Sequence, residues 1–379
     1  MYEIIDKYIE KLMTSKPDMP LWNIEAIKQG KKPAWNYIDG CMMVSLIELY
    51  KTTKEEKYLD FVKKFVDFYV NEDGSILGYH LDKYSTDDVS ETRILFDLYN
   101  YFKDEKYSKA IEMVYQQIKT HPRTIEGNFW HKKIYPNQVW LDGLYMMMPF
   151  YTRYETLRNK MNNYADIIKQ YKNVHQIMRN KETGLYYHGY DSSKTMFWAD
   201  KETGLSKNYW LRSIGWFTVS LIDVYEYMDE QMFDEYHTIK EIFKETIDAI
   251  LKYQDTESKM FYQVPNFMGR EGNYLETSGS SMIAYAILKG VRLKALPSRY
   301  QQIGLDIFNG ICKKYLTIKD GDLNLGGICL VAGLGPENNL RRDGTYEYYM
   351  SEPVVENDAK GVGPFIMAYT EVKRVESEN

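Results

Sequence analysis

Apolar residues recur along most of this chain at the spacing of a helix that buries one face. Near the N-terminus, Ile4, Ile5, Tyr8, Ile9 and Leu12 recur at this spacing, and charged residues lie between them. The alternating pattern of a half-buried strand is rare by comparison. The spacing predicts twelve helices, at 2–14, 37–51, 56–70, 88–102, 106–119, 139–155, 160–178, 210–228, 236–253, 278–292, 297–315 and 361–376.

The connections between these helices alternate in length. Short links follow every even-numbered helix, whereas each odd-numbered helix is followed by a long loop, and long loops in compact domains are commonly functional. This alternation predicts six helical hairpins closed into a ring, which is an all-α (α/α)6 barrel forming a single domain over residues 1–379. An irregular helical bundle is the alternative. The predicted long loops are 15–36, 71–87, 120–138, 179–209, 254–277 and 316–360.

Every long loop leads into the N-terminus of an even-numbered helix, so all six loops are expected at one end of the barrel. Helix N-termini carry unpaired N–H groups and partial positive charge, which favour an anionic ligand. The functional site is therefore predicted where the long loops meet the even-numbered helices.

Acidic residues mark two of these junctions. Asp142 lies within a predicted helix beside Gly143, where a carboxylate is costly unless it is solvated, paired or functional. Asp87 and Asp88 stand together at another helix start. One of them can be explained as an N-cap, which leaves the other as a candidate for function.

Three further junction residues have both a structural and a functional interpretation. Arg212 and Trp216 lie four residues apart on one helix face, either as a packed cation–π pair or as a carboxylate clamp beside a sugar-stacking surface. His188 lies in a tyrosine-rich turn, where it either binds a substrate hydroxyl group or stabilises its loop.

Composition narrows the function classes. Aromatic residues make up 15% of the chain, with 35 Tyr and 7 Trp, which suits either sugar stacking or helix packing. The net charge is −6 and no basic run is present, so a nucleic-acid partner is not expected. No stretch approaches the roughly 20 apolar residues of a membrane span, and the N-terminus does not read as a signal peptide.

The chain also lacks the motifs of cofactor and metal enzymes. It has no Walker loop, no dinucleotide fingerprint and no His–Glu–His metal spacing, and its three cysteines are not spaced as metal ligands. We therefore predict a cytoplasmic protein, monomer or homodimer, without cofactor or metal, whose chemistry depends on carboxylates and aromatic residues.

Several junction motifs together resemble glycoside hydrolase family 105, the unsaturated rhamnogalacturonyl hydrolases. The similarity extends from about Trp35 to Tyr369. It rests on the order and number of the motifs rather than on any single one. They are Arg123-Thr-x-Glu-Gly, Tyr135-Pro-Asn-Gln-x-Trp-x-Asp-Gly-Leu-Tyr, Thr183-Gly-Leu-Tyr-Tyr-His-Gly-Tyr, Trp210-x-Arg-x-x-Gly-Trp and Glu356-Asn-Asp-Ala-Lys-Gly.

The resemblance implies an (α/α)6 barrel that removes a 4,5-unsaturated galacturonyl residue from the non-reducing end of short acidic pectin fragments. An aspartic acid protonates C4 and helps water add to C5, and the resulting hemiketal opens and expels the attached sugar. It also implies site residues. These are Asp142 as the catalytic acid and base, Asp87 as the second functional aspartate with Asp88 left open as the alternative, and Tyr37, Trp140, His188, Arg212 and Trp216 as substrate contacts.

Other functions remain open at this stage. A related unsaturated glucuronyl hydrolase would act on glycosaminoglycan-like or other lyase-generated disaccharides. An ordinary inverting glycosidase would hold Asp87 and Asp142 about 6.5–9.5 Å apart around a water molecule. A noncatalytic sugar-binding protein would leave the substrate double bond unchanged.

Overall fold

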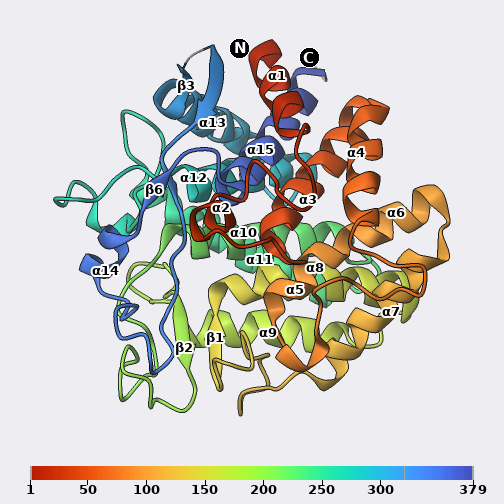
Figure 1. The fold of residues 1–379 in the computed structure, drawn as a ribbon. Coiled ribbons are helices and arrows are strands. Elements are labelled where there is room, and N and C mark those ends of the chain that lie inside the picture. Colours follow the sequence, from red (N-terminus) through yellow and green to blue (C-terminus); the bar gives the residue numbers. More distant parts are fainter. Residues whose placement is uncertain (1, 320, 378–379) are drawn as a thin grey trace.

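The computed structural model describes residues 2–319 and 321–377, so both extreme ends of the predicted domain 1–379 lie outside the described residues. Its helices form two layers around a common centre (Figure 1). The predicted (α/α)6 barrel is confirmed. The inner layer comprises α3 (Tyr37–Thr53), α5 (Thr86–Ser90) continued through a 3-10 turn (Glu91–Ile94) into α6 (Leu95–Phe102), α8 (Leu141–Arg158), α10 (Leu211–Tyr227), α12 (Thr277–Arg292) and α15 (Ala359–Ser377).

The outer layer supplies the second helix of each hairpin. Each inner helix packs against the next around the ring, and α15 packs against α3, which closes it. Figure 1 shows α1 beside α15, so the first and last helices complete the outer and inner layers together. The outer helices are α1 (Tyr2–Leu12), α4 (Glu56–Asp67), α7 (Glu105–Thr120), α9 (Tyr164–Ile177), α11 (Phe233–Ile250) and α13 (Gln301–Tyr315).

The distribution of apolar and charged residues explains which helices belong to the inner layer. In α10 every residue from Leu211 to Tyr225 is buried, as expected for a helix with neighbours on all sides. In α4 only one face is buried, formed by Tyr58, Leu59, Val62, Phe65 and Val66, while the charged face meets solvent. No helix of the described residues is long and apolar enough to cross a membrane.

The structure departs from the predicted elements mainly in the long loops. Two short helices, α2 (Ile24–Gln29) and α14 (Tyr346–Ser351), lie in segments predicted as loops. The helix predicted from 139 begins only at Leu141, because Trp140 has extended backbone and belongs to a strand. The short strands are β1 (Gln138–Trp140) with β2 (Gly189–Asp191), β3 (Leu316–Lys319) with β4 (Asp322–Leu325), and β5 (Ile328–Cys329) with β6 (Val354–Val355), all antiparallel.

Five of the six long loops are fastened to the start of an inner helix. The first residue of α5, α8, α10, α12 and α15 donates its backbone N–H to a carbonyl oxygen of the next long loop around the ring, over 2.8–3.1 Å. These bonds satisfy N–H groups that a helix start leaves free. The loops are thereby held over one end of the barrel. The donor and acceptor pairs are Thr86 with His131, Leu141 with His188, Leu211 with Gln263, Thr277 with Gly327, and Ala359 with Trp22.

A buried ion cluster joins three inner segments at the barrel centre. Asp223 of α10 accepts hydrogen bonds from Arg93 over 2.9 Å and from Lys289 of α12 over 2.7 Å. Tyr285 also donates to Asp223 over 2.8 Å, and the charged side chains are at most 2% exposed. The cluster therefore connects segments that are far apart in the sequence.

Candidate active site

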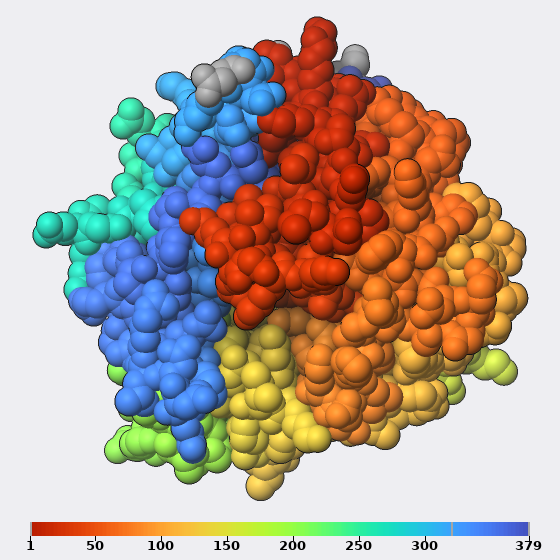
Figure 2. All heavy atoms as spheres, viewed as in Figure 1, coloured from red at the N-terminus to blue at the C-terminus, as the bar shows by residue number. Residues whose placement is uncertain are grey.

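A cavity of about 280 Å³ lies at the barrel end where the long loops gather. Figure 2 shows the segments that surround it meeting on one face: the N-terminal loop, the loops near residues 85 and 135, and the last long loop. Its volume is sufficient for about one sugar ring with some water. It is lined by Glu25, Asn36, Tyr37, Ile38, Asp87, Asp88, His131, Lys132, Tyr135, Trp140, Asp142, Met146, Val331, Ala332 and Arg342.

Asp142 occupies the first turn of α8 and is 8% exposed. Its Oδ2 atom lies 3.2 Å from Nε2 of His188, but no hydrogen bond joins them, and neither atom has a hydrogen-bond partner among the described residues. His188 is fully buried behind the cavity wall, and its Nδ1 atom lies 2.7 Å from the hydroxyl group of Tyr349. A carboxyl group, an imidazole ring and a phenol thus lie next to one another in that order.

Asp87 and Asp88 both line the cavity but differ in charge. Burial opposes ionisation of Asp87, yet Lys132, whose Nζ lies 2.5 Å from Oδ2, and then His131 hold its pKa below the ordinary value. Burial, and next the charge of Asp87, raise the pKa of Asp88 to about 7. The cavity therefore holds an ionised carboxylate beside a carboxyl group that is largely protonated below neutral pH.

Aromatic rings form one wall of the cavity. Trp140 stacks on His131 with ring centroids 4.4 Å apart and lies 4.6 Å from the ring of Tyr135. Burial lowers the pKa of His131 to about 4, so this imidazole is neutral at neutral pH. Tyr37, the first residue of α3, also lines the cavity. Together these rings give the cavity apolar surface.

Three predicted substrate contacts lie outside the lining, namely His188, Arg212 and Trp216. Arg212 is 1% exposed and donates to Ser278 Oγ over 2.7 Å and to the carbonyl oxygen of Cys329, with Glu276 3.8 Å away. Trp216 is also 1% exposed and stacks on Tyr145, with ring centroids 4.1 Å apart. These interactions fix the start of α10 to its neighbours, and they leave the guanidinium group of Arg212 with partners inside the protein.

Arg342 and Lys132 are cavity residues that the sequence did not single out. Lys132 forms the ion pair with Asp87, whereas Arg342, from the last long loop, makes no ion pair with a described residue. Both lie in predicted long loops, Lys132 in 120–138 and Arg342 in 316–360. A signal was present in the sequence, because a basic side chain in a long loop that leads to an acidic site can serve an anionic ligand.

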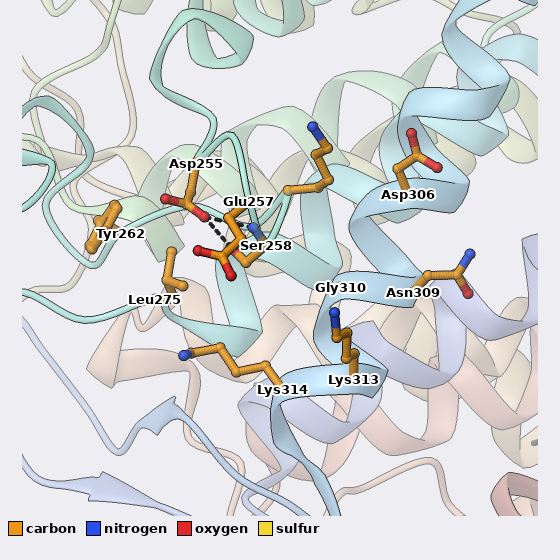
Figure 3. Close-up of a pocket in the computed structure, with 11 residues that line it drawn as sticks. Asp255, Glu257, Ser258, Tyr262, Leu275, Asp306, Asn309, Gly310, Lys313 and Lys314 are labelled. Carbon is orange, nitrogen blue, oxygen red and sulfur yellow. Dashed lines mark hydrogen bonds between the residues drawn. The ribbon is translucent and has the colours of Figure 1, made fainter.

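A larger cavity, of about 620 Å³, lies elsewhere, between α13 and the loop before α12 (Figure 3). Its charged side chains include Asp255, Asp306 and Lys314, and Asp255 accepts hydrogen bonds within its own turn from Ser258. None of the predicted site residues reaches it. No group of three or more His, Cys, Asp or Glu side chains within residues 2–319 and 321–377 is arranged to hold a metal ion.

Comparison with known proteins assigns the chain to a family. The model of Glycosyl Hydrolase Family 88 matches residues 4–376. A family 105 glycoside hydrolase of C. acetobutylicum has a similar structure, with a TM-score of 0.88, 41% identity and coverage of 97% of this chain and 99% of that one.

Two curated relatives were also found. Protein Atu3128 of Agrobacterium fabrum is 34% identical over 232 residues, which are 60% of this chain and 97% of that protein. The unsaturated rhamnogalacturonyl hydrolase YesR of Bacillus subtilis is 26% identical over 266 residues, 69% of this chain and 72% of that one. With a family model that matches almost its whole length, the chain belongs to the glycoside hydrolases of families 88 and 105.

Proposed function

We propose that this enzyme removes a 4,5-unsaturated galacturonyl residue from the non-reducing end of rhamnogalacturonan oligosaccharides by hydrating the C4=C5 double bond. The observation that carries the proposal is the position of Asp142, whose carboxyl group lines a cavity of about one sugar ring beside an aromatic wall. The relative of 26% identity whose name specifies this activity supports the choice of substrate.

The chemistry requires one group that first donates and then accepts a proton. We propose that the carboxyl group of Asp142 protonates C4 and that a water molecule adds its oxygen to C5, returning a proton to Asp142. The product is a hemiketal at C5. Opening of its ring breaks the bond between C5 and the ring oxygen, which leaves a ketone at C5 and a hemiacetal at C1. The hemiacetal then collapses to an aldehyde, and the attached sugar leaves as an alcohol with the proton of the C1 hydroxyl group.

The substrate carboxylate needs a cationic partner, and the cavity offers two basic side chains. Lys132 is already paired with Asp87 over 2.5 Å, whereas Arg342 has no ion pair with a described residue. We therefore assign the uronate contact to Arg342, because a free guanidinium group can bind a carboxylate through two parallel hydrogen bonds. Arg212, the residue expected from the sequence, has its donors engaged within the protein.

The glucuronyl alternative differs in the leaving sugar rather than in the ring that reacts. Elimination by a lyase makes C4 and C5 trigonal, so galacturonyl and glucuronyl residues give the same unsaturated ring. Discrimination must therefore come from the sugar that leaves, outside a cavity that encloses about one ring. The cytoplasmic location and the monomeric or homodimeric state stay predictions from the sequence.

The test is to follow the ultraviolet absorbance of the double bond with rhamnose-linked and hexosamine-linked unsaturated disaccharides. We expect faster loss of absorbance with the rhamnose-linked substrate, and no cleavage of a saturated galacturonide. Faster turnover of the hexosamine-linked substrate would favour the glucuronyl alternative. Cleavage of the saturated compound would indicate an ordinary glycosidase, and an unchanged double bond with bound sugar would indicate a noncatalytic protein.

Replacement of the catalytic carboxyl group gives the first prediction. Asp142→Asn is expected to fold normally and to lose about 10²–10⁴-fold in kcat, because the amide cannot supply the proton. Asp306→Asn, in the separate larger cavity, is the matched control and should retain wild-type turnover. Wild-type turnover in Asp142→Asn would remove this residue from the acid–base role.

A further inference from the structure

We propose that Tyr349 is a positioning residue that fixes His188 in the tautomer with its proton on Nε2, so that this proton faces Asp142. The inference rests on the proposed function for its catalytic consequence, although the tautomer itself can be measured without substrate. It assigns a role in the reaction to α14, a short helix of the last long loop.

The geometry places the phenol where only one arrangement satisfies every group. Tyr349 is fully buried, and burial, as the largest cause, raises the pKa of its hydroxyl group well above the ordinary value. The phenol is therefore a donor, and among the described residues its hydroxyl group has one hydrogen-bond partner, His188 Nδ1 at 2.7 Å. A neutral imidazole has one donor and one acceptor nitrogen, so acceptance at Nδ1 places the proton on Nε2.

The opposite tautomer leaves two groups unsatisfied. With its proton on Nδ1, His188 would donate to the phenol oxygen, and the buried phenol hydrogen would have no acceptor among the described residues. The lone pair of Nε2 would then face Oδ2 of Asp142 at 3.2 Å, which is repulsive once that carboxyl group is ionised. The Tyr349–His188 bond and the 3.2 Å separation of Nε2 from Asp142 therefore favour the tautomer with its proton on Nε2.

Aromatic rings hold the imidazole in place. The ring of His188 packs against Trp210 and Trp140, with centroids 4.8 and 5.7 Å apart. His131 interacts electrostatically with both Asp142 and His188, and burial lowers its pKa to about 4, so that it is neutral. After burial, the charges of Tyr348, Asp142, Asp343 and Cys329 also raise the pKa of Tyr349.

The consequence for catalysis concerns the carboxylate that remains after proton transfer to C4. The Nε2 proton of His188 stabilises the negative charge on Oδ2 and leaves Oδ1 to exchange protons with the substrate and water. Without Tyr349, both tautomers become accessible, and a fraction of the enzyme presents a lone pair to the catalytic carboxylate. Tyr349 thus acts on the reaction through His188 and does not touch the substrate.

The tautomer is measurable in the free enzyme by NMR of protein labelled with nitrogen-15 at its histidines. The chain has six histidines, so the signals of His188 can be assigned from their loss in His188→Gln. We expect a protonated Nε2 and an unprotonated Nδ1 in the wild type, and a mixture in Tyr349→Phe. A protonated Nδ1 in the wild type would overturn the proposal, whatever the substrate of the enzyme proves to be.

Kinetics test the catalytic consequence. Tyr349→Phe should lower kcat by about 10- to 100-fold with little change in KM, and should move the basic limb of the pH–rate profile to higher pH. Tyr348→Phe is the matched control, because this neighbouring buried phenol accepts a hydrogen bond from the backbone of Gly333 rather than contacting His188. It should keep the wild-type kcat and pH profile.

A double-mutant cycle distinguishes positioning from a general loss of stability. The amide of His188→Gln can place a donor near the Nε2 position but has no acceptor at the position of Nδ1, so adding Tyr349→Phe should then change kcat by less than about twofold. An additive loss, an equal loss in Tyr348→Phe, or an unchanged kcat in Tyr349→Phe would overturn the inference. Should the wild type leave unsaturated disaccharides intact, the proposed function fails, while the NMR result still decides the tautomer.

Discussion

Asp87 and Asp88 are sequence neighbours with opposite electrostatic surroundings. Asp87 has Lys132 at 2.5 Å, whereas Asp88 has burial and the charge of Asp87 acting against its ionisation. The difference arises from one cation that only one of the two carboxyl groups contacts. It gives the pair distinct protonation states over the pH range in which a proton-transfer enzyme works.

This difference predicts a pH-dependent stability for Asp88→Asn. The pKa of Asp88 is 3.8 in the unfolded chain and about 7 in the folded protein. The folded state therefore binds more protons between these values, and this residue reduces stability progressively as pH rises from about 4 to 7. Because Asp88 is partly exposed, we expect the variant to gain about 1–2 kcal/mol at pH 8 and almost nothing at pH 4.

Denaturant unfolding of Asp88→Asn at pH 4 and pH 8 measures this change in the free energy of unfolding. Asp87→Asn is the matched variant, for which the change is expected to have the opposite sign. The pKa of Asp87 is lowered, so its contribution to stability is present above its unfolded value and is lost as pH falls through the folded one. Asp87→Asn should therefore be less stable than the wild type at pH 7. A pH-independent difference in either variant would contradict the assigned charges.

At the residue scale, a local motif in the sequence was enough to infer where some cavity residues lie. Asp142 and Trp140 lie in one short segment whose position at a helix start could be inferred from the pattern around it. The surroundings of Arg212 could not, because its partners Ser278 and Cys329 are 66 and 117 residues away. Arg342 was missed for the same reason, since its approach to the cavity depends on how the last loop folds over the barrel.

At the scale of elements, the long helices were predictable and the short pieces were not. Helices such as α10 and α12 have enough residues for a spacing pattern to be read. Strands of two to four residues, such as β1 and β5, are too short to show alternation, and they form because a neighbouring loop supplies the partner strand. The loops that build the site are therefore the part of the fold least visible in the sequence.

The crossing of α10 and α12 depends on glycine at the contact, which leads to a further prediction. A Cβ atom at Gly215 would lie 2.7 Å from Met282 Sδ and 3.3 Å from the Cα atom of Gly279. Alanine favours a helix over glycine by about 1 kcal/mol, but here it would force the two inner helices apart. Gly215→Ala should lower stability by roughly 1–3 kcal/mol in denaturant unfolding, and a stabilised variant would show that the contact can relax.

At the scale of the whole molecule, the Asp223 cluster connects inner segments that the sequence keeps far apart. Asp223→Asn would leave Arg93 and Lys289 buried without their shared carboxylate, which typically costs about 3–5 kcal/mol. We expect a loss of that size in the free energy of unfolding. Glu3→Gln, which breaks the exposed pair with Lys7, is the control and should change it by less than about 1 kcal/mol. Equal effects would mean that the central cluster contributes no more than a surface pair.

The backbone hydrogen bond from Ala359 to Trp22 constrains when the barrel can close during protein synthesis. It joins the first long loop to the last inner helix, so it can form only when the C-terminal segment has left the ribosome. Arg342 and Tyr349 also belong to the last-made part of the chain, whereas Asp142 is made much earlier. A nascent or C-terminally shortened chain would thus carry the proposed catalytic acid without its proposed partners, and enzymatic activity would report on completion of the ring.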